Sequence, residues 1–137
     1  MADVAVTAIE VLKDSGTKFE DGILGATVTA GQTVYKDTSD SNKFKLADAN
    51  ASSTTANVAG IAMNGGASGQ PVRVAVGGTL DPGFTVTVGA VYVQSATAGG
   101  IAPVADLLTG MYPTILGVGI TASQLKLILD VSGVAVP

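Results

Sequence analysis

The sequence contains no cysteine, no histidine and no tryptophan. Without cysteine there is neither a disulfide nor a thiolate, and the chain carries no mark of its redox compartment. Without histidine, the commonest general base and the commonest metal ligand are missing. Most hydrolase and zinc-enzyme mechanisms are therefore excluded. We expect a protein that is not an enzyme and that holds no metal and no cofactor.

Charged and aromatic residues are scarce as well. They make up 13% and 4% of the chain, whereas an average soluble domain has about 25% charged residues. The formal net charge is −4 and the sequence pI is about 4.4. The seven basic residues are scattered along the chain, so phosphate neutralisation is a poor source of binding energy for it. We expect no nucleic-acid partner.

Long uninterrupted hydrophobic runs are missing too. The most apolar stretch, residues 101–120, contains Asp106 and the prolines Pro103 and Pro113, which is not typical of a membrane span. The first residues include Asp3 and no basic region, unlike a secretory signal. We therefore expect neither a membrane partner nor secretion by that route.

Glycine, alanine and valine are abundant instead. There are 18 glycines, and 47% of the 137 residues are hydrophobic. Valine favours strands and glycine favours turns, so the composition predicts an all-β protein with short strands and many turns. The length suits a single domain with one core.

The chain contains a similar unit twice. Val34-Tyr35 recurs at Val91-Tyr92, an offset of 57 residues. Because self-similarity indicates repeated supersecondary units, we predict two pseudo-repeats, at about residues 28–78 and 84–133. The alternative, that both halves are merely rich in Val, Ala and Gly, stays open. The other matching segments are 44–46 with 101–103 and 58–61 with 115–118 at the same offset, and 71–76 with 124–129 at an offset of 53.

The pseudo-repeats also bear on the segment 121–131. Alone it could be a helix, because Thr121 and Gln124 resemble a capping box that precedes helically spaced leucines and isoleucines. Its partner segment 71–76 alternates apolar with small or charged residues, is β-branched, and begins with a proline, which a strand tolerates at its start. We therefore predict strands in both places.

Turn-forming residues mark two connections. Asn64-Gly65 is a strong hairpin signal, and the glycine-rich segment 64–70 lacks the Lys-Ser or Lys-Thr pair of a phosphate-binding loop. The segment 77–83 combines glycines with Pro82. We expect it to be the turn that connects the two pseudo-repeats.

Residues 1–27 match neither pseudo-repeat, whereas residues 28–137 form the predicted β domain. Alternating apolar residues that begin at Val4 indicate an extended arm or a first strand. The charged run 13–21 predicts a turn after it. Such an arm could pair with its own barrel or with a neighbouring molecule, and both alternatives remain open.

Few residues carry the chemistry of a ligand site. The densest acidic run is Asp37–Asn42, whose oxygens could bind a hard cation such as Ca²⁺. It lacks the glycine and the terminal glutamate of the helical calcium loop, so we expect a solvated turn. Tyr35 and Tyr92 could stack on a sugar ring, but their matching positions in the pseudo-repeats indicate paired core residues.

Five charged residues are candidates for contacts with a partner. Glu10, Glu20 and Asp21 lie in the N-terminal stretch and could meet a basic partner at the rim of an interface. Arg73 and Lys126 take comparable positions in the two pseudo-repeats. We expect both to point outward and to provide a repeated external contact.

Five short motifs rich in Gly, Ala and Val follow one another along the chain. They are Val28-Thr29-Ala30-Gly31 with Val34-Tyr35, Val58-Ala59-Gly60-Ile61-Ala62, Val72-Arg73-Val74-Ala75-Val76-Gly77-Gly78, Gly89-Ala90-Val91-Tyr92 and Ile115-Leu116-Gly117-Val118-Gly119. Their order resembles that in bacteriophage capsid decoration (cement) proteins, a family of small head-stabilising proteins rich in Gly, Ala and Val. The resemblance spans roughly residues 25–133 and leaves residues 1–26 unaligned.

The resemblance implies a compact β-barrel or β-tulip-like domain, commonly a homotrimer, on the outer surface of the capsid in the virion. Its partner there would be the major capsid protein, whose subunits it would bridge. Binding only to the expanded head would stabilise that head by linkage. The alternative is a phage tail or fibre β-module that binds a surface such as a glycan, against which the scarcity of aromatic residues argues.

Overall fold

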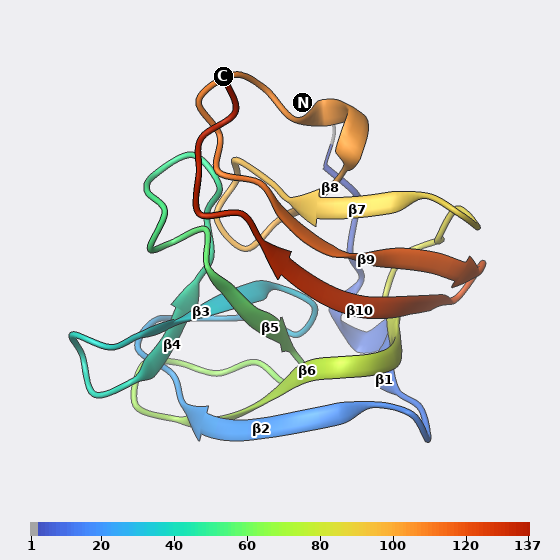
Figure 1. Ribbon diagram of the computed structural model, residues 1–137. Helices are drawn as coiled ribbons and strands as arrows, with labels where there is room; N and C mark the ends of the chain where they lie inside the picture. Colours follow the sequence, from blue (N-terminus) through green and yellow to red (C-terminus); the bar gives the residue numbers. More distant parts are fainter. Residues whose placement is uncertain (1–2) are drawn as a thin grey trace.

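A computed structural model describes residues 3–137 of the chain (Figure 1). The regular structure of this part is almost entirely β, with two short 3-10 turns, η1 (Ala8–Glu10) and η2 (Val104–Asp106). The predicted all-β class is confirmed. The strands are β1 (Val11–Lys13), β2 (Lys18–Ile23), β3 (Thr33–Asp37), β4 (Lys43–Leu46), β5 (Val58–Ala62), β6 (Pro71–Pro82), β7 (Val91–Gln94), β8 (Ile101–Pro103), β9 (Thr114–Thr121) and β10 (Gln124–Val131).

The strands form a curled antiparallel sheet with the shape of a half-barrel. The order is β4-β3-β5-β6-β10-β9-β7-β8, and β1 and β2 pair with β6 off this path. Figure 1 shows β2 to β5 in one half of the molecule and β7 to β10 in the other, with β6 between them. The barrel-like architecture predicted from the sequence is therefore present.

Strands β3 to β6 pair with one another in the same pattern as strands β7 to β10. In each set the first strand pairs with the second and the third, and the third pairs with the fourth. A register shift interrupts the first-to-third pairing at the same place, between Val34 and Tyr35 and between Tyr92 and Val93. By register, Tyr92 is therefore the counterpart of Val34.

This register corrects the expected equivalence of the two tyrosines. Tyr92 is 3% exposed, its ring centroid lies 5.2 Å from that of Phe84, and its hydroxyl accepts the Thr87 N–H at 3.0 Å. Tyr35 is only half-buried against the same core. The positions differ because β3 maps onto β7 at an offset of 58, while β5 maps onto β9 at 57.

A glycine at equivalent positions lets the third strand of each set lie against the fourth. A Cβ on Gly60 would lie 2.1 Å from the carbonyl oxygen of Ala75, and a Cβ on Gly117 would lie 2.0 Å from that of Lys126. Such distances are far inside van der Waals contact, so a side chain at either position would push the two strands apart.

Strand β6 belongs to both halves of the molecule. It runs from Pro71 to Pro82, so the turn predicted at 77–83 is wrong for most of its length. Its first part pairs with β2 and β5, and its last part pairs with β1 and β10. Gly78 (φ 76°) serves a close approach within the strand, because a Cβ there would lie 1.8 Å from the Gly16 carbonyl oxygen.

The N-terminal stretch pairs with the sheet of its own chain. Strands β1 and β2 both lie against β6, and the Val4 N–H donates to the Ile101 carbonyl at 2.9 Å. The composition predicted one turn over the charged run 13–21, and this prediction is wrong for most of its length. The turn is short and closes with the Thr17 N–H on the Asp14 carbonyl at 3.3 Å, and β2 begins at the next residue.

Two other local predictions are confirmed. Asn64 closes the hairpin between β5 and β6, where its Oδ1 accepts the Arg73 N–H at 2.7 Å and its Nδ2 donates to the Pro71 carbonyl at 3.2 Å. The segment 121–131 is strand rather than helix, because β9 and β10 flank a tight turn there.

A buried polar network joins the two halves. Gln94 and Thr33 are fully buried, and the Thr33 hydroxyl donates to the Gln94 side-chain oxygen. The Gln94 Nε2 donates to the carbonyls of Ala47 at 2.9 Å and Ser95 at 3.1 Å. We call this network the seam between the halves, and each of its named polar groups has a partner. The hydrophobic cluster around Leu116 also contains residues of both halves.

Candidate functional site

The sequence-predicted residues Asp21 and Arg73 lie side by side on the outer face of β2 and β6. They are cross-strand partners, and their side chains form a two-bond ion pair with N···O distances of 2.8 and 3.2 Å. The guanidinium also lies 5.2 Å from the Phe19 ring centroid. The Arg73 guanidinium lowers the pKa of the Asp21 carboxyl below its usual value. Both side chains remain more than half exposed.

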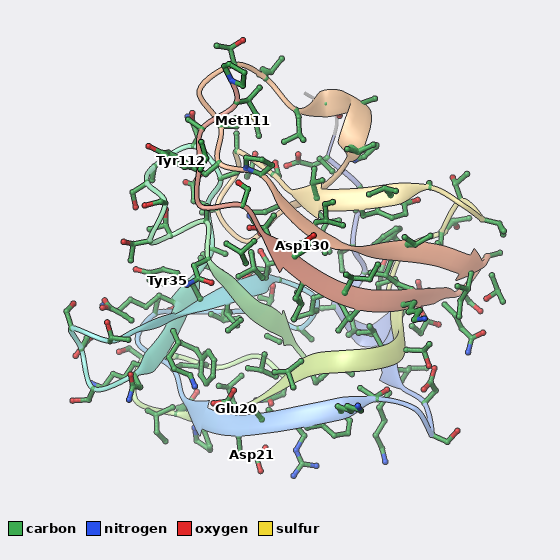
Figure 2. All side chains as sticks on the ribbon, in the orientation of Figure 1. Glu20, Asp21, Tyr35, Met111, Tyr112 and Asp130 are labelled. Carbon is green, nitrogen blue, oxygen red and sulfur yellow. The ribbon has the colours of Figure 1, made fainter. Side chains whose placement is uncertain are left out.

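Glu20 lies next to Asp21 in sequence but does not share its surface. Neighbouring residues of a strand point to opposite faces, and Figure 2 shows the two side chains on opposite sides of β2. The Glu20 carboxylate forms an ion pair with Lys36 of β3, whose ammonium lies 5.6 Å from the Phe44 ring centroid. Both carboxylates are therefore already paired within the chain, and their contact with a partner stays a prediction.

Arg73 and Lys126 are both exposed but are not equivalent, so that expectation is wrong. In the ladders, Ala62 faces Val74 and Gly119 faces Leu125. The connecting loop is thus six residues shorter in the second half, not four. By this register, Gln124 is the counterpart of Arg73, and Lys126 is the counterpart of Ala75.

Glu10 lies in η1, beside an open groove on another part of the surface. We call this the η1 groove; its volume is about 340 Å³. Its lining residues come from η1 and β1, from β6 and the segment after it, and from the β9–β10 turn. Its lining includes Ile9, Glu10, Leu12, Asp81, Phe84 and Ala122.

The outer side of β7, β9 and β10 is an apolar surface that the sequence analysis missed. Lys126 faces Val118, and Val118 faces Val91, so the three side chains share one face. Ile120 and Ile128 are 41% and 51% exposed on the same strands. We call these five residues the β9 face. The alternation of side chains along β9 and β10 could have indicated which residues share a face. It does not reveal which of two apolar faces is buried.

The acidic run Asp37–Asn42 forms the turn expected of it. Lys45 makes ion pairs with Asp37 at 2.8 Å and with Asp40 at 3.1 Å. The hydrogen bond from Lys45 lowers the pKa of Asp37 to about 2. Ser41 and Asn42 have φ angles of 56° and 60°, as is typical of a tight turn. The carboxylates that could have bound a cation are thus turned toward a lysine.

Among residues 3–137, no group of three or more acidic side chains is arranged to hold a metal ion. Another carboxylate, Asp14, accepts hydrogen bonds from the Thr79 hydroxyl, which lowers its pKa. In the same part of the chain, no helix has the length and apolar character needed to cross a membrane. Three surface features remain as candidates for binding a partner: the Asp21–Arg73 pair, the η1 groove and the β9 face.

Comparison with known proteins adds no relative. A scan of the sequence against protein-family models gives no match, and no curated protein matches the chain in sequence. The function is therefore inferred from the residues and surfaces of the chain itself.

Proposed function

We propose that this chain is a structural virion protein that binds the outside of a bacteriophage capsid. There it bridges subunits of the major capsid protein, stabilises the expanded head, and acts as a homotrimer without catalysis. The order of the Gly-, Ala- and Val-rich motifs along the chain supports this proposal. So does a β domain whose two halves repeat one pairing pattern.

The observation that carries the proposal is the β9 face. Ile120 and Ile128 expose 41% and 51% of their surface beside the half-buried Val91 and Val118, with Lys126 as the only charged member. Contiguous apolar surface of this kind usually marks an interaction site, and the centre of an interface is depleted in charge. A protein whose work is to be covered by other subunits needs such a surface.

Within this proposal, copies of the chain meet through the β9 face. Lys126 and the exposed Asp130 lie on the same strand, β10, and neither forms an ion pair with another residue of the described range 3–137. Lys126 on the β9 face and Asp130 further along β10 together present one charge of each sign, so a second copy can be accepted there without net repulsion. The shell then contacts other parts of the surface, including Glu10 and the Asp21–Arg73 pair.

The stabilisation of the head follows from linkage. A protein that binds the expanded shell and not its disrupted form stabilises the shell by about 2.7 kcal/mol per site when its free concentration is 100 times Kd. Many sites on one shell add up, so modest affinity is enough. No conformational change in the β domain is required.

The proposal is tested by co-sedimentation of the purified protein with expanded heads that lack it, with light scattering of the free protein during size-exclusion chromatography. We expect saturable binding at a fixed ratio to the shell, a higher melting temperature of the heads, and the mass of a trimer. A folded protein that does not bind heads would contradict the proposal and favour the tail or fibre alternative.

A matched pair of variants separates the β9 face from general surface effects. Ile120→Ser combined with Ile128→Ser removes two exposed apolar side chains from the face, and we expect a monomer that binds heads weakly. Ile23→Ser removes a side chain that is 43% exposed on β2, away from that face. We expect the Ile23 variant to remain trimeric. Equal masses for all three proteins would refute the assignment of the β9 face to contacts between copies.

A further inference from the structure

The η1 groove combines exposed apolar side chains with unpaired negative charge. Ile9 is 88% exposed and Leu12 is 57% exposed, and together with Phe84 they give the groove three large apolar side chains. Glu10 and Asp81 are its charged lining residues. Large apolar side chains held in water beside carboxylates are not explained by the packing of this chain.

The backbone segment that carries Ile9 and Leu12 is held against the sheet by hydrogen bonds. The Thr7 N–H donates to the Gly83 carbonyl at 2.8 Å, and β1 pairs with the end of β6. Val11, between the two exposed apolar residues, is 7% exposed and anchors the strand in the core. Ile9 and Leu12 are thus held outward by a fixed backbone, and a ligand would not have to pay for ordering them.

The charge of the groove is negative and is not neutralised within the described chain. Neither Glu10 nor Asp81 forms an ion pair with another residue of the range 3–137. One Asp81 oxygen accepts the Gly83 N–H at 3.0 Å, which leaves the other carboxylate oxygen for a partner. No lysine or arginine lines the groove. Two carboxylates beside apolar surface favour a cationic ligand that also has an apolar part.

We propose that the η1 groove binds an extended segment of a partner protein in which lysine or arginine alternates with bulky apolar residues. The inference rests on the proposed function, in which the partner is a subunit of the shell. The apolar side chains of the segment would cover Ile9, Leu12 and Phe84, and its cations would meet Glu10 and Asp81. A second copy of this chain is the poorer occupant, because it brings the same acidic groove and a net charge of −4.

The test uses the purified full-length protein and a fluorescein-labelled peptide, Gly-Lys-Leu-Lys-Leu-Lys-Gly, with binding followed by fluorescence anisotropy. Two control peptides replace every lysine by glutamate or every leucine by serine. We expect saturable binding of the first peptide alone, with an affinity that falls as salt is added because the contacts are exposed. Equal binding of all three peptides, or no binding of the first, would overturn the proposal.

Variants locate the binding on the protein. Leu12→Ser removes an apolar contact and should weaken binding about 10-fold, since burying such a side chain stabilises by about 1.5 kcal/mol or more. Glu10→Gln removes a rim charge and should weaken binding about 2- to 5-fold. Ile23→Ser is the control on β2 and should bind as the unaltered protein does. Circular dichroism checks that each variant is folded.

The same variants distinguish failure of this inference from failure of the proposed function. If Leu12→Ser loses the peptide but the unaltered protein never binds heads, the groove stands and the capsid function fails. If Leu12→Ser binds peptide and heads as well as the unaltered protein does, the groove assignment fails and the capsid function stands. A change of oligomeric mass in Leu12→Ser would identify a second copy as the occupant and overturn the proposal.

Discussion

The two halves of this molecule share a pairing pattern but differ in surface chemistry. Strands β3 to β6 and β7 to β10 are joined in the same order, with a register shift at the same place. Residues 28–78 nevertheless contain seven charged side chains, whereas residues 84–133 contain three. The shared pattern therefore depends on backbone geometry and core packing, which surface charge leaves unaffected.

The two halves also differ in how far their surface side chains are already partnered within the chain. In the first half and the adjoining β2, charges are paired with one another, as in Asp21 with Arg73 and Lys45 with Asp37. In the second half, the β9 face leaves Ile120 and Ile128 in water. Exposed ion pairs contribute little stability and need no partner. Exposed apolar surface does gain from being covered.

The largest loss of stability is expected from replacing the glycine that both halves have at equivalent positions. Gly60→Ala and Gly117→Ala each place a Cβ about 2 Å from a carbonyl oxygen of the next strand. We expect each to lower the free energy of unfolding by about 2–4 kcal/mol, as measured by urea denaturation. Gly77→Ala is the control, because its Cβ would meet only the Lys18 side chain, at 3.6 Å.

Measuring these two variants together tests whether the two halves are equivalent at this glycine. Similar losses at Gly60 and Gly117 would mean that the two halves depend equally on this close approach. A tolerated alanine at either site would show that the two strands can separate there. That result would contradict the close packing on which the equivalence of the halves depends.

The second largest effect is expected at the seam between the halves. Gln94→Leu leaves the buried Thr33 hydroxyl without its partner, and it removes the Gln94 hydrogen bond to the Ala47 carbonyl, which keeps only the Gly99 N–H. Losing a buried partner costs about 1–3 kcal/mol, so we expect a loss of that size in urea denaturation. In a double-mutant cycle, adding Thr33→Val should recover part of this loss. Strictly additive losses would mean that the seam does not depend on the pair.

The sequence predicts the strands of each half better than it predicts how they are joined. Alternating valines and the shared glycine indicate most strands, and Asn64-Gly65 correctly marks a hairpin. The one-residue shift that makes Tyr92 the counterpart of Val34 leaves no sign in composition. It arises because the connection between the first and second strands is one residue shorter in the second half, since Val34 pairs with Leu46 and Tyr92 pairs with Pro103. A search for matching letters does not detect this difference.

Features that depend on contacts between distant segments could not be predicted from the sequence for a related reason. The glycines of 77–83 have turn chemistry locally, but β6 continues through them because β1 and β10 supply hydrogen-bond partners. Glu10 could be singled out by its charge, whereas its neighbours in the η1 groove come from distant parts of the chain. Both outcomes depend on which segments meet, and tertiary pairing overrides local preference.

A smaller effect is expected on the surface of the second half. Ile128→Lys adds charge beside Lys126 on the β9 face without opening a cavity, since Ile128 is 51% exposed. We expect a change in the free energy of unfolding of the monomer within about 0.5 kcal/mol. The oligomeric mass in size-exclusion light scattering should fall at the same time. A trimer that survives this substitution would place the contacts between copies elsewhere.

The smallest effect is expected from the ion pairs of the first half, and it depends on pH. The pKa of Asp37 is lowered to about 2 by its hydrogen bond from Lys45, so the native state favours the charged carboxylate. A lowered native pKa contributes stability above the ordinary value near 4, and this contribution is lost as the pH falls toward 2. Asp37→Asn should therefore flatten the decrease in melting temperature between pH 4 and 2. Asp130→Asn, in the second half, provides the matched control, and an equal flattening by both variants would show that acid sensitivity does not distinguish the halves.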